Sequence, residues 1–482
     1  MASLSPRPSG AVLPRRPPAP RPLPRHPGFW GFFKALRDNP IAAWAEPAYR
    51  DPYMLVPGRG LRPGLLFVTE PDMLRRIFID AVEIYDKGDI VRRRLQPFLG
   101  DSLLIAGPES WRPQRRIAAP LFSARRVEAS LPAMVAVARE AEARLAALPR
   151  GEGIDAAEAM SGFAYEVISR IAFSSDTVSD PPAFSHAIAA YFDTLGRVDL
   201  ASYLRLPPWI PTLDRLRARP SLALFRREIG GIVARRQARL EAEGEDALPD
   251  DLLTRLLTSP DPQTGQRLPG SLVYDDAVTF LAAGHETTAN VLTWTLFLLS
   301  ENPEWDHRVA EEAASVLGGR DPAPDDLPRL EALRMVVDET MRLYPPAPVI
   351  PRVAAQADRL GAVDVPPGTF VFTSPYVSHR HRLRWEEPDA FRPERFAAGC
   401  RDAIDRFAYF PFGAGPRVCI GAAFSMQEVT VALAILLQRF RFEAIRPDEV
   451  FPQATITLRP RAGLPMRVLP RRQARDRARP GT

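Results

Sequence analysis

The spacing of apolar residues along the chain predicts a mostly helical protein. Apolar side chains recur at intervals of three and four residues, as on one face of an amphipathic helix. This spacing predicts helices over Leu131–Leu148, Leu222–Glu243, Leu272–Leu299, Pro328–Leu343 and Gly421–Phe440. Strand-like runs are few and short, as in GLLFVTE, GTFVFTS and ATITLRP. We therefore expect a mainly α fold with small β-sheets.

The longest apolar run, Ala277–Ser300, is long enough to imitate a transmembrane helix. His285 and Glu286 lie at its centre, and ionisable groups at that position are costly in lipid. We therefore expect a helix through the core of a soluble domain. Because no stretch resembles an interdomain linker, we expect a single domain over residues 29–470. Outside it we expect a disordered Pro/Arg-rich tail at 1–28 and a disordered basic tail at 471–482.

The excess positive charge of the chain lies at its two ends. The net charge is +5, yet residues 1–28 hold five arginines and no acidic residue, and residues 471–482 hold five arginines and one aspartate. The body between them is therefore net negative, and we expect no nucleic-acid partner. The first 28 residues lack the apolar run of a signal peptide or membrane anchor. An organelle leader is disfavoured because an amphipathic helix is missing there, so we expect a cytoplasmic protein.

One of the two cysteines lies in a glycine-rich turn, FGAGPRVCIG. Cys419 directly precedes a predicted helix, where backbone N–H groups stabilise the thiolate, which is the metal-binding form of cysteine. Gly413 and Gly415 permit sharp turns, and Gly421 would let the helix pass close to a flat cofactor. Arg417 can pair with a carboxylate of such a cofactor. The turn therefore favours a cofactor held by a thiolate.

Two other interpretations of this cysteine stay open at this point. A cysteine in a glycine-rich turn is most often a buried structural residue. A zinc site could instead use Cys419 with Cys400, His379 and His381, but neither cysteine has the paired spacing of a zinc-binding loop. We expect Cys400 to be structural.

Further patterns accompany the cysteine turn. The stretch AGHETT lies at the centre of the predicted core helix. The pattern E-x-x-R occurs twice, and only the second, Glu339 to Arg342, is followed at once by a helix stop, LYPP. The remaining patterns are W-x-x-x-R (Trp111 and Arg115), FRPERF (with Arg395) and TITLRPRAGLPMRV.

In their order along the chain, these motifs resemble those of the cytochrome P-450 superfamily. The turn FGAGPRVCIG fits the haem-binding pattern F-x-x-G-x-R-x-C-x-G at every specified position, and the resemblance covers roughly residues 29–470. It implies the cytochrome P-450 fold, with a haem buried between the long central helix and the helix that follows the cysteine loop. It also implies a soluble, bacterial-type member without a fused reductase.

The resemblance assigns an expected role to each motif. Cys419 is the expected axial ligand of a haem b. Thr287 and Glu286 are expected to supply protons to dioxygen, with Ala283 and Gly284 leaving room over the haem. The other expected haem contacts are Trp111, Arg115, Arg352, Phe412, Gly413, Arg417 and Gly421. A structural network of Glu339, Arg342 and Arg395 is expected to fix the cysteine loop.

The implied activity is that of a haem-thiolate monooxygenase acting on a hydrophobic small molecule with dioxygen. Electrons would come ultimately from NAD(P)H through a separate ferredoxin or flavodoxin and its reductase, because the chain has no dinucleotide-binding fingerprint. Arg112, Arg116 and Arg406 are candidates for the docking face, and residues 90–105 and 191–206 for the substrate pocket. The alternatives are a peroxide-dependent or isomerising enzyme of the same fold, or a non-catalytic haem-binding sensor.

Overall fold

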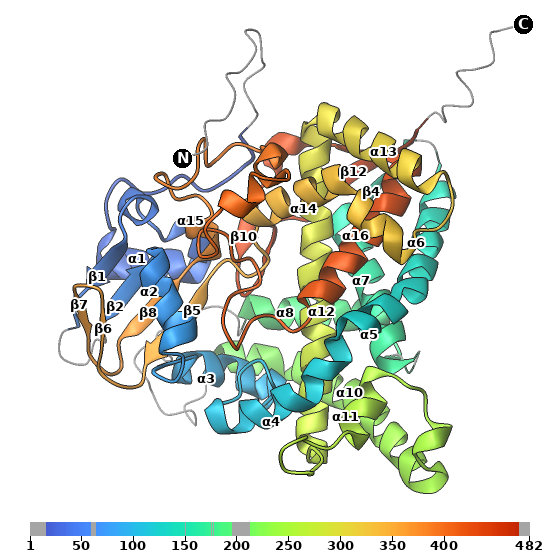
Figure 1. The fold of residues 1–482 in the computed structure, drawn as a ribbon, viewed down its shortest axis with the longest axis horizontal. Helices are drawn as coiled ribbons and strands as arrows, with labels where there is room; N and C mark the ends of the chain where they lie inside the picture. The colour runs from blue at the N-terminus through green and yellow to red at the C-terminus, as the bar shows by residue number, and fades with distance from the viewer. Residues whose placement is uncertain are drawn as a thin grey trace, which may run out of the picture.

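The computed structural model describes residues 16–58, 64–149, 151–174, 176, 178–194 and 213–471. Most of these residues are helical, and the largest sheet lies to one side of the helices (Figure 1). A mainly α fold with small sheets is therefore confirmed. The helices are α1 (Gly28–Asp38), α2 (Pro71–Arg75), α3 (Gly88–Leu99), α4 (Pro108–Ala118), α5 (Ala124–Ala129), α6 (Leu131–Ala146), α7 (Ala156–Phe173), α8 (Pro181–Thr194), α10 (Leu213–Glu243), α11 (Leu252–Thr258), α12 (Gly270–Glu301), α13 (Pro303–Leu317), α14 (Glu331–Leu343), α15 (Pro375–Ser378) and α16 (Ala422–Arg439).

Helix α12 is the central element of the fold. It runs through the middle of the molecule, with other helices around it (Figure 1). Nearly all its side chains from Val273 to Leu299 are buried, as expected for a helix that is apolar on all sides. Helices α7, α14 and α16 pack against it. This helix had been predicted over Leu272–Leu299.

The other four predicted helices are also present, with shifted ends. α6 ends at Ala146, shortly before Pro149, and α10 begins earlier than predicted, at Leu213. α14 begins at Glu331 because the preceding segment, Pro324–Arg329, forms a separate 3-10 helix. α16 begins directly after Gly421. The apolar spacing therefore predicted the helices themselves better than their boundaries.

The largest sheet joins the N-terminal part of the chain to the segment that follows α14. Its strands lie in the order β1-β2-β8-β5-β3, with β2 parallel to β8 and the other neighbours antiparallel. The pairing places Arg352, on β5, close to the end of the β3 segment that precedes Lys87. The strands are β1 (Tyr53–Val56), β2 (Leu65–Val68), β3 (Tyr85–Asp86), β5 (Ile350–Ala354) and β8 (Phe370–Thr373).

The remaining strands form a three-stranded sheet and two hairpins. The sheet has the order β4-β12-β9, with β4 at Gly153–Asp155, β9 at Phe440–Ala444 and β12 at Pro465–Pro470. The hairpins are β6 (Asp358–Leu360) with β7 (Val363–Val365), and β10 (Pro452–Ala454) with β11 (Leu458–Pro460). The run ATITLRP, expected to be one strand, contains the turn of this second hairpin. There the N–H of Thr455 donates to the carbonyl of Thr457 over 3.0 Å.

Part of the predicted N-terminal tail contacts the folded body. The hydroxyl of Tyr344 donates to the carbonyl of Pro18 over 2.8 Å, and the N–H of Glu46 donates to the carbonyl of Leu23 over 2.8 Å. The described chain is therefore already packed before residue 29. Within the described ranges, none of the helices combines the length and apolar character needed to cross a bilayer.

Candidate functional site

The cysteine loop is a tight turn that leads into α16. The N–H of Cys419 donates to the carbonyl of Phe412 over 3.0 Å, which closes the loop on itself. Gly413 and Gly415 have φ angles of 74° and 73°, a region that favours glycine. A Cβ added to Gly415 would lie 1.8 Å from the carbonyl oxygen of Phe78. The glycines are therefore required both by the turn and by the close approach of another backbone segment.

The thiol of Cys419 lies at the protein surface, and its pKa is raised. Its side chain is exposed to solvent, while burial is the main factor that raises the pKa of the thiol. The guanidinium of Arg115 and the N–H of Gly421 act in the opposite direction and favour the thiolate. An accessible thiol with nearby groups that favour the thiolate can serve as a ligand to a bound group.

The stretch AGHETT on α12 has one exposed residue among buried ones. Ala283 is exposed, whereas His285, Glu286 and Thr288 are buried. The hydroxyl of Thr288 lies 3.0 Å from the hydroxyl of Ser425 on α16, so this hydrogen bond joins α12 to the helix that follows the cysteine loop.

Gly284 lies differently from what we expected. A Cβ added to it would meet the side chain of Ile168 on α7 at 3.2 Å. Gly284 therefore allows α7 to cross α12 closely, and the open side of the helix at this point is that of Ala283.

The carboxyl group of Glu286 is buried and only partly hydrogen-bonded. Its Oε1 accepts from the hydroxyl of Thr457 over 2.6 Å, and its Oε2 has no partner in the described structure. Burial raises the pKa of this carboxyl group, and the hydrogen bond from Thr457 lowers it to a smaller degree. The neighbouring hydroxyl of Thr287 donates to the carbonyl of Ala283 over 2.6 Å.

Several positive charges gather beside the cysteine loop. The guanidinium of Arg417 lies 4.8 Å from the centre of the Trp111 ring. Arg352 is buried, and burial followed by the charge of Arg417 lowers its pKa to about 10. Burial, followed by the charges of Arg352 and Arg417, holds the pKa of Lys87 well below its usual value. Positive groups brought together away from water favour an anionic ligand.

These residues fit a haem. The carboxylate of Asp86 opposes the charges of Lys87, Arg352 and Arg417, but it is already bound by Arg92. The two carboxylates of a haem would provide the missing negative charge. The exposed thiol of Cys419 would provide an iron ligand, and thiolate ligation is one of the established modes for haem.

The residues Glu339, Arg342 and Arg395 meet as expected. Two nitrogens of Arg342 donate to the two carboxylate oxygens of Glu339 over 2.6 and 2.8 Å, and both side chains are fully buried. Arg395 lies farther away, with its Nε 3.6 Å from Oε1 of Glu339. It donates instead to the carbonyl of Glu387 over 2.8 Å. The pair is thus a fork-like buried interaction with a second arginine beside it.

Arg342 also binds the backbone of the segment that leads toward the cysteine loop. Its remaining donors reach the carbonyls of His379, Pro388 and Ala390 over 2.7, 2.8 and 2.9 Å. The first E-x-x-R pattern behaves differently, because Arg334 binds Asp338 over 3.0 Å, not Glu331. Only the second pattern therefore builds a buried network.

The structure does not support a zinc site. In the part of the chain that is described, no three His, Cys, Asp or Glu side chains come together as metal ligands. The Nε2 of His379 accepts a hydrogen bond from the N–H of Phe410 over 3.0 Å. The zinc interpretation is therefore replaced by a structural use of this histidine.

The three arginines considered for a docking face are not equivalent. Arg116 makes two hydrogen bonds to Asp261, of 2.7 and 2.6 Å, and Arg112 pairs with Glu83. The guanidinium of Arg406 lies 6.0 Å from the Phe407 ring centre. Arg116 and Arg112 are thus already engaged within the chain.

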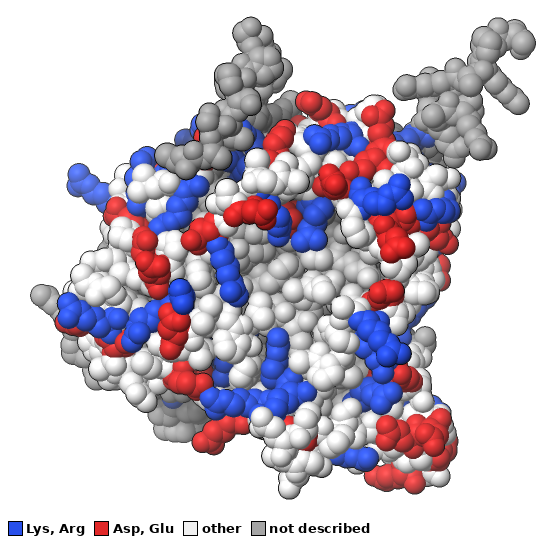
Figure 2. Space-filling model, viewed as in Figure 1, with Lys and Arg blue, Asp and Glu red and all other residues white. Residues whose placement is uncertain are grey.

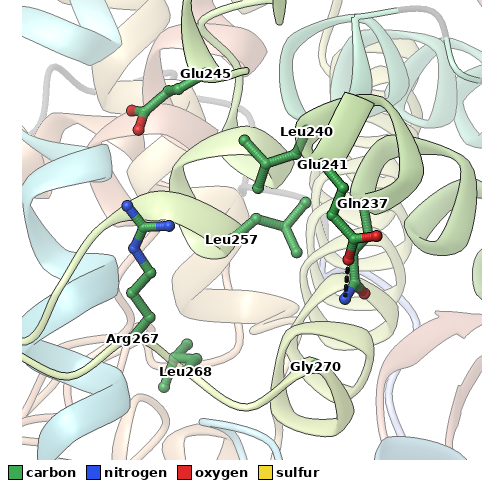
Figure 3. Close-up of a pocket in the computed structure, with 8 residues that line it drawn as sticks. All are labelled: Gln237, Leu240, Glu241, Glu245, Leu257, Arg267, Leu268 and Gly270. Atoms are coloured by element: carbon green, nitrogen blue, oxygen red, sulfur yellow. Dashed lines mark hydrogen bonds between the residues drawn. The ribbon is translucent and has the colours of Figure 1, made fainter. Parts of the chain in front are cut away.

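A separate cavity of about 470 Å³ lies between α10, α11 and the start of α12 (Figure 3). It contains none of the residues predicted from the sequence. Gln237 donates to Glu241 over 3.3 Å on one side, and Arg267 lies on the other (Figure 3). Its lining residues are Gln237, Leu240, Glu241, Glu245, Leu257, Arg267, Leu268 and Gly270.

Sequence reasoning missed Lys87 and Thr457. Lys87 is one of only two lysines in the chain, which could have marked it, but nothing local indicates that it is half-buried beside arginines. Thr457 lies 171 residues from Glu286, its hydrogen-bond partner. No local pattern links such positions, because the fold alone brings them together.

Comparison with known proteins gives the same family as the motifs. The sequence model of the Cytochrome P450 family matches residues 20–463. Cyclooctatin synthase from Streptomyces melanosporofaciens is 31% identical over 94% of this chain and 97% of its own length. Pentalenene oxygenase from Streptomyces avermitilis is 32% identical over 80% of this chain and 84% of its own length. Cyclooctat-9-en-7-ol 5-monooxygenase, also from Streptomyces melanosporofaciens, is 31% identical over 86% and 88%.

The match covers nearly the whole chain, and the cysteine loop, central helix and buried Glu339–Arg342 pair occur in one fold. The chain therefore belongs to the cytochrome P450 family, as an enzyme of its monooxygenase class with haem iron as cofactor.

Proposed function

We propose that this protein is a haem-thiolate monooxygenase that hydroxylates a hydrophobic small molecule with electrons from a separate redox partner. The observation that carries the proposal is the position of Cys419. Its exposed thiol lies at the start of α16, and α16 is hydrogen-bonded to the polar centre of α12 through Ser425 and Thr288.

In this proposal, Cys419 is the iron ligand, and the neighbouring cations hold the haem carboxylates. The cations are Lys87, Arg115, Arg352 and Arg417, with Trp111 stacked under Arg417. A haem with a thiolate ligand supplies electron density that favours cleavage of the O–O bond of dioxygen. Arg115 has a second effect, because its charge lowers the pKa of the Cys419 thiol.

Glu286 and Thr287 are the residues proposed to relay protons. Because burial raises the pKa of Glu286, its carboxyl group can keep a proton in a site that water enters poorly. Oε1 accepts from Thr457, so the proton is expected on Oε2, the oxygen without a partner. The Thr287 hydroxyl donates to Ala283, which leaves its oxygen able to accept a hydrogen bond.

Protons would reach Glu286 from the side of β11. Arg459, two residues beyond Thr457, pairs with Asp193 over 2.5 Å, and both are partly exposed. The charge of Arg459 lowers the pKa of Glu286 and that of Asp193 raises it, so both lie near the carboxyl group. This ion pair is the proposed solvent end of the path.

The proposed substrate is hydrophobic. Leu104, in the expected pocket segment 90–105, is a large apolar side chain that is 41% exposed. The second expected segment, 191–206, lies mostly outside the described residues. Relatives named for pentalenene and cyclooctat-9-en-7-ol, an alkene and an alkenol by name, support an apolar substrate.

A separate electron donor is proposed to dock on the face that carries the cysteine loop. This face is turned toward the viewer in Figure 1, and the same view in Figure 2 shows a largely uncharged hollow with basic and acidic side chains around it. A surface of this kind suits a small, charged partner protein whose binding weakens as salt rises.

Replacing Thr287 with Ala tests the proposed reaction. The compound that gives the largest haem spin-state shift in a binding screen serves as substrate, and product and peroxide are measured per electron consumed. We expect product per electron to fall about 10- to 100-fold, with peroxide released, while Thr287→Ser retains most of the product. If Thr287→Ala forms as much product per electron as wild type, Thr287 has no role in proton transfer. Full activity with added peroxide and no reductant would favour the peroxide-dependent alternative.

A further inference from the structure

His379 occupies an unusual position between the buried Glu339–Arg342 pair and the cysteine loop. It is fully buried directly after α15. Its backbone carbonyl accepts from Arg342 over 2.7 Å, and its ring Nε2 accepts from the N–H of Phe410 over 3.0 Å. One residue therefore contacts the network at its backbone and the approach to the cysteine loop at its side chain.

The hydrogen bond to Phe410 continues directly into the cysteine loop. The carbonyl of Phe410 accepts from the N–H of Gly413 over 3.0 Å, and the carbonyl of Phe412 accepts from the N–H of Cys419 over 3.0 Å. Phe410 itself is buried, so its N–H would have no water to bind if the imidazole were removed. Hydrogen bonds thus connect Arg342 to His379, His379 to Phe410, and Phe410 to the cysteine loop.

The imidazole ring is held in one orientation by its neighbours. The Phe410 ring meets it almost perpendicularly, at 87° with 5.5 Å between centroids, and the Tyr409 ring lies 5.1 Å away. Tyr409 is fixed in turn, because its hydroxyl donates to the carbonyl of Asp338, next to Glu339, over 3.0 Å. The ring therefore cannot turn its Nε2 away without disturbing the surrounding aromatic side chains.

The ring is also in the protonation state that an acceptor needs. Burial, followed by the charges of Arg342 and Arg380, holds the pKa of His379 well below its usual value. A neutral imidazole with the proton on Nδ1 has a lone pair on Nε2, whereas a protonated ring has none. The low pKa is thus consistent with the observed hydrogen bond.

We propose that His379 is a positioning residue for the iron ligand. By accepting a hydrogen bond from the N–H of Phe410, its Nε2 fixes this backbone segment and so couples the position of Cys419 to the Glu339–Arg342 pair. The proposal rests on the proposed function only in taking Cys419 as the haem ligand. It replaces the zinc interpretation of this histidine with a role that depends on a single acceptor atom.

The test compares three substitutions in the haem-loaded protein. His379→Gln places an oxygen the same number of bonds from Cα as Nε2, His379→Asn keeps a polar group that is too short, and His379→Leu removes the acceptor. His381→Gln is the matched control, since His381 is also buried but is not bonded to Phe410. The measurements are the rate at which the reduced, CO-bound protein loses the Soret band of thiolate-ligated haem, and hydrogen exchange at the Phe410 amide.

We expect the Asn and Leu variants to lose the thiolate-type band at least about tenfold faster than wild type, with faster exchange at Phe410. The Gln variant and His381→Gln are expected to stay within about threefold of wild type. The acceptor role is wrong if His379→Gln loses the thiolate-type band as fast as His379→Leu. It is also wrong if the Phe410 amide of the Leu variant exchanges hydrogen at the wild-type rate. A wild type without any thiolate-type band would contradict the proposed function instead, and the exchange data would still decide the role of His379.

Discussion

The buried Glu339–Arg342 pair and the polar centre of α12 are built in opposite ways. On the cysteine side, Arg342 uses its donors on Glu339 and on three backbone carbonyls, and both side chains are fully buried. On the α12 side, buried polar atoms lack partners in the described structure: Nδ1 of His285, Oε2 of Glu286 and Nδ2 of Asn290. The donors of Arg342 are thus all used, whereas these three atoms on α12 are not.

This difference matches two different tasks. A group that must hold a metal ligand in one geometry benefits from donors and acceptors that are all satisfied, because each alternative arrangement would leave a buried polar group unpaired. A group that must pass protons needs an atom that is free to give or accept one. We therefore expect substitutions on the cysteine side to affect stability and haem ligation, and those on α12 to affect the chemistry.

The largest expected effect is on the Glu339–Arg342 pair. Arg342→Leu leaves the carboxylate of Glu339 buried without its main partner, which we expect to cost about 3–5 kcal/mol of unfolding free energy. Urea unfolding and the haem content of the purified protein measure this. The matched control is Glu331→Ala in the other E-x-x-R pattern, where the side chain is exposed and the change should stay within about 0.5 kcal/mol. Equal effects of the two substitutions would contradict the comparison.

Replacement of Glu286 should change stability less than replacement of Arg342, but it should strongly reduce the product formed per electron. Glu286→Gln keeps an oxygen that accepts from Thr457 but removes the acidic proton. Product per electron should fall about tenfold or more, while the free energy of unfolding changes by less than about 1 kcal/mol. Loss of stability without loss of coupling would show that Glu286 is structural.

Thr457→Val sharpens this result, because it removes the donor to Glu286 Oε1 and keeps the size of the side chain. Without that hydrogen bond the pKa of Glu286 should rise further, since the bond lowers it in the folded protein. Difference infrared spectroscopy should then show the carboxyl C=O stretch of Glu286 at a changed frequency, and Glu286→Gln should abolish the band. An identical band in wild type and Thr457→Val would mean that the two side chains do not interact.

The effect expected to bear least on the chemistry concerns Asp276, near the start of α12. Its Oδ1 accepts from the N–H of Leu103 over 2.7 Å, its Oδ2 has no partner in the described structure, and burial raises its pKa to about 7. Because the folded protein binds this proton more tightly than the unfolded chain does, stability should fall as pH rises from about 4 to 7. Between pH 5 and 8 the loss should be about 2.5 kcal/mol.

Asp276→Asn, which stays neutral and keeps an acceptor for Leu103, should lose less stability over this pH range. Urea unfolding at pH 5, 6, 7 and 8 measures the difference, with the exposed Asp246→Asn as control. If the stability of wild type and of Asp276→Asn changes with pH in parallel, Asp276 is not the cause of the pH dependence.

The sequence predicted the elements whose chemistry is encoded locally. The apolar spacing of α12, α14 and α16 and the pattern around Cys419 depend only on nearby residues, and each is present. The Glu339–Arg342 pair also lies on one helix, and its helix stop distinguished it from Glu331 and Arg334. Local sequence sufficed in these cases because neighbouring residues make the interaction.

What could not be predicted depends on distant contacts. The β-branched run before Arg459 is typical of a strand, but pairing of β10 with β11 makes it a turn that contains Thr457. Gly284 was expected to face the haem, and the crossing of α7 instead accounts for it. The positive surroundings of the half-buried Lys87 depend on β5 and the cysteine loop, which supply Arg352 and Arg417.

The most direct test of the account is the absorption spectrum of the reduced, CO-bound protein with each cysteine replaced in turn. The account predicts the red-shifted Soret band of thiolate-ligated haem in wild type and in Cys400→Ser, and its loss in Cys419→Ser with haem still bound by Lys87, Arg352 and Arg417. An unchanged band in Cys419→Ser would contradict the assignment of the iron ligand, on which every other proposal about this site depends.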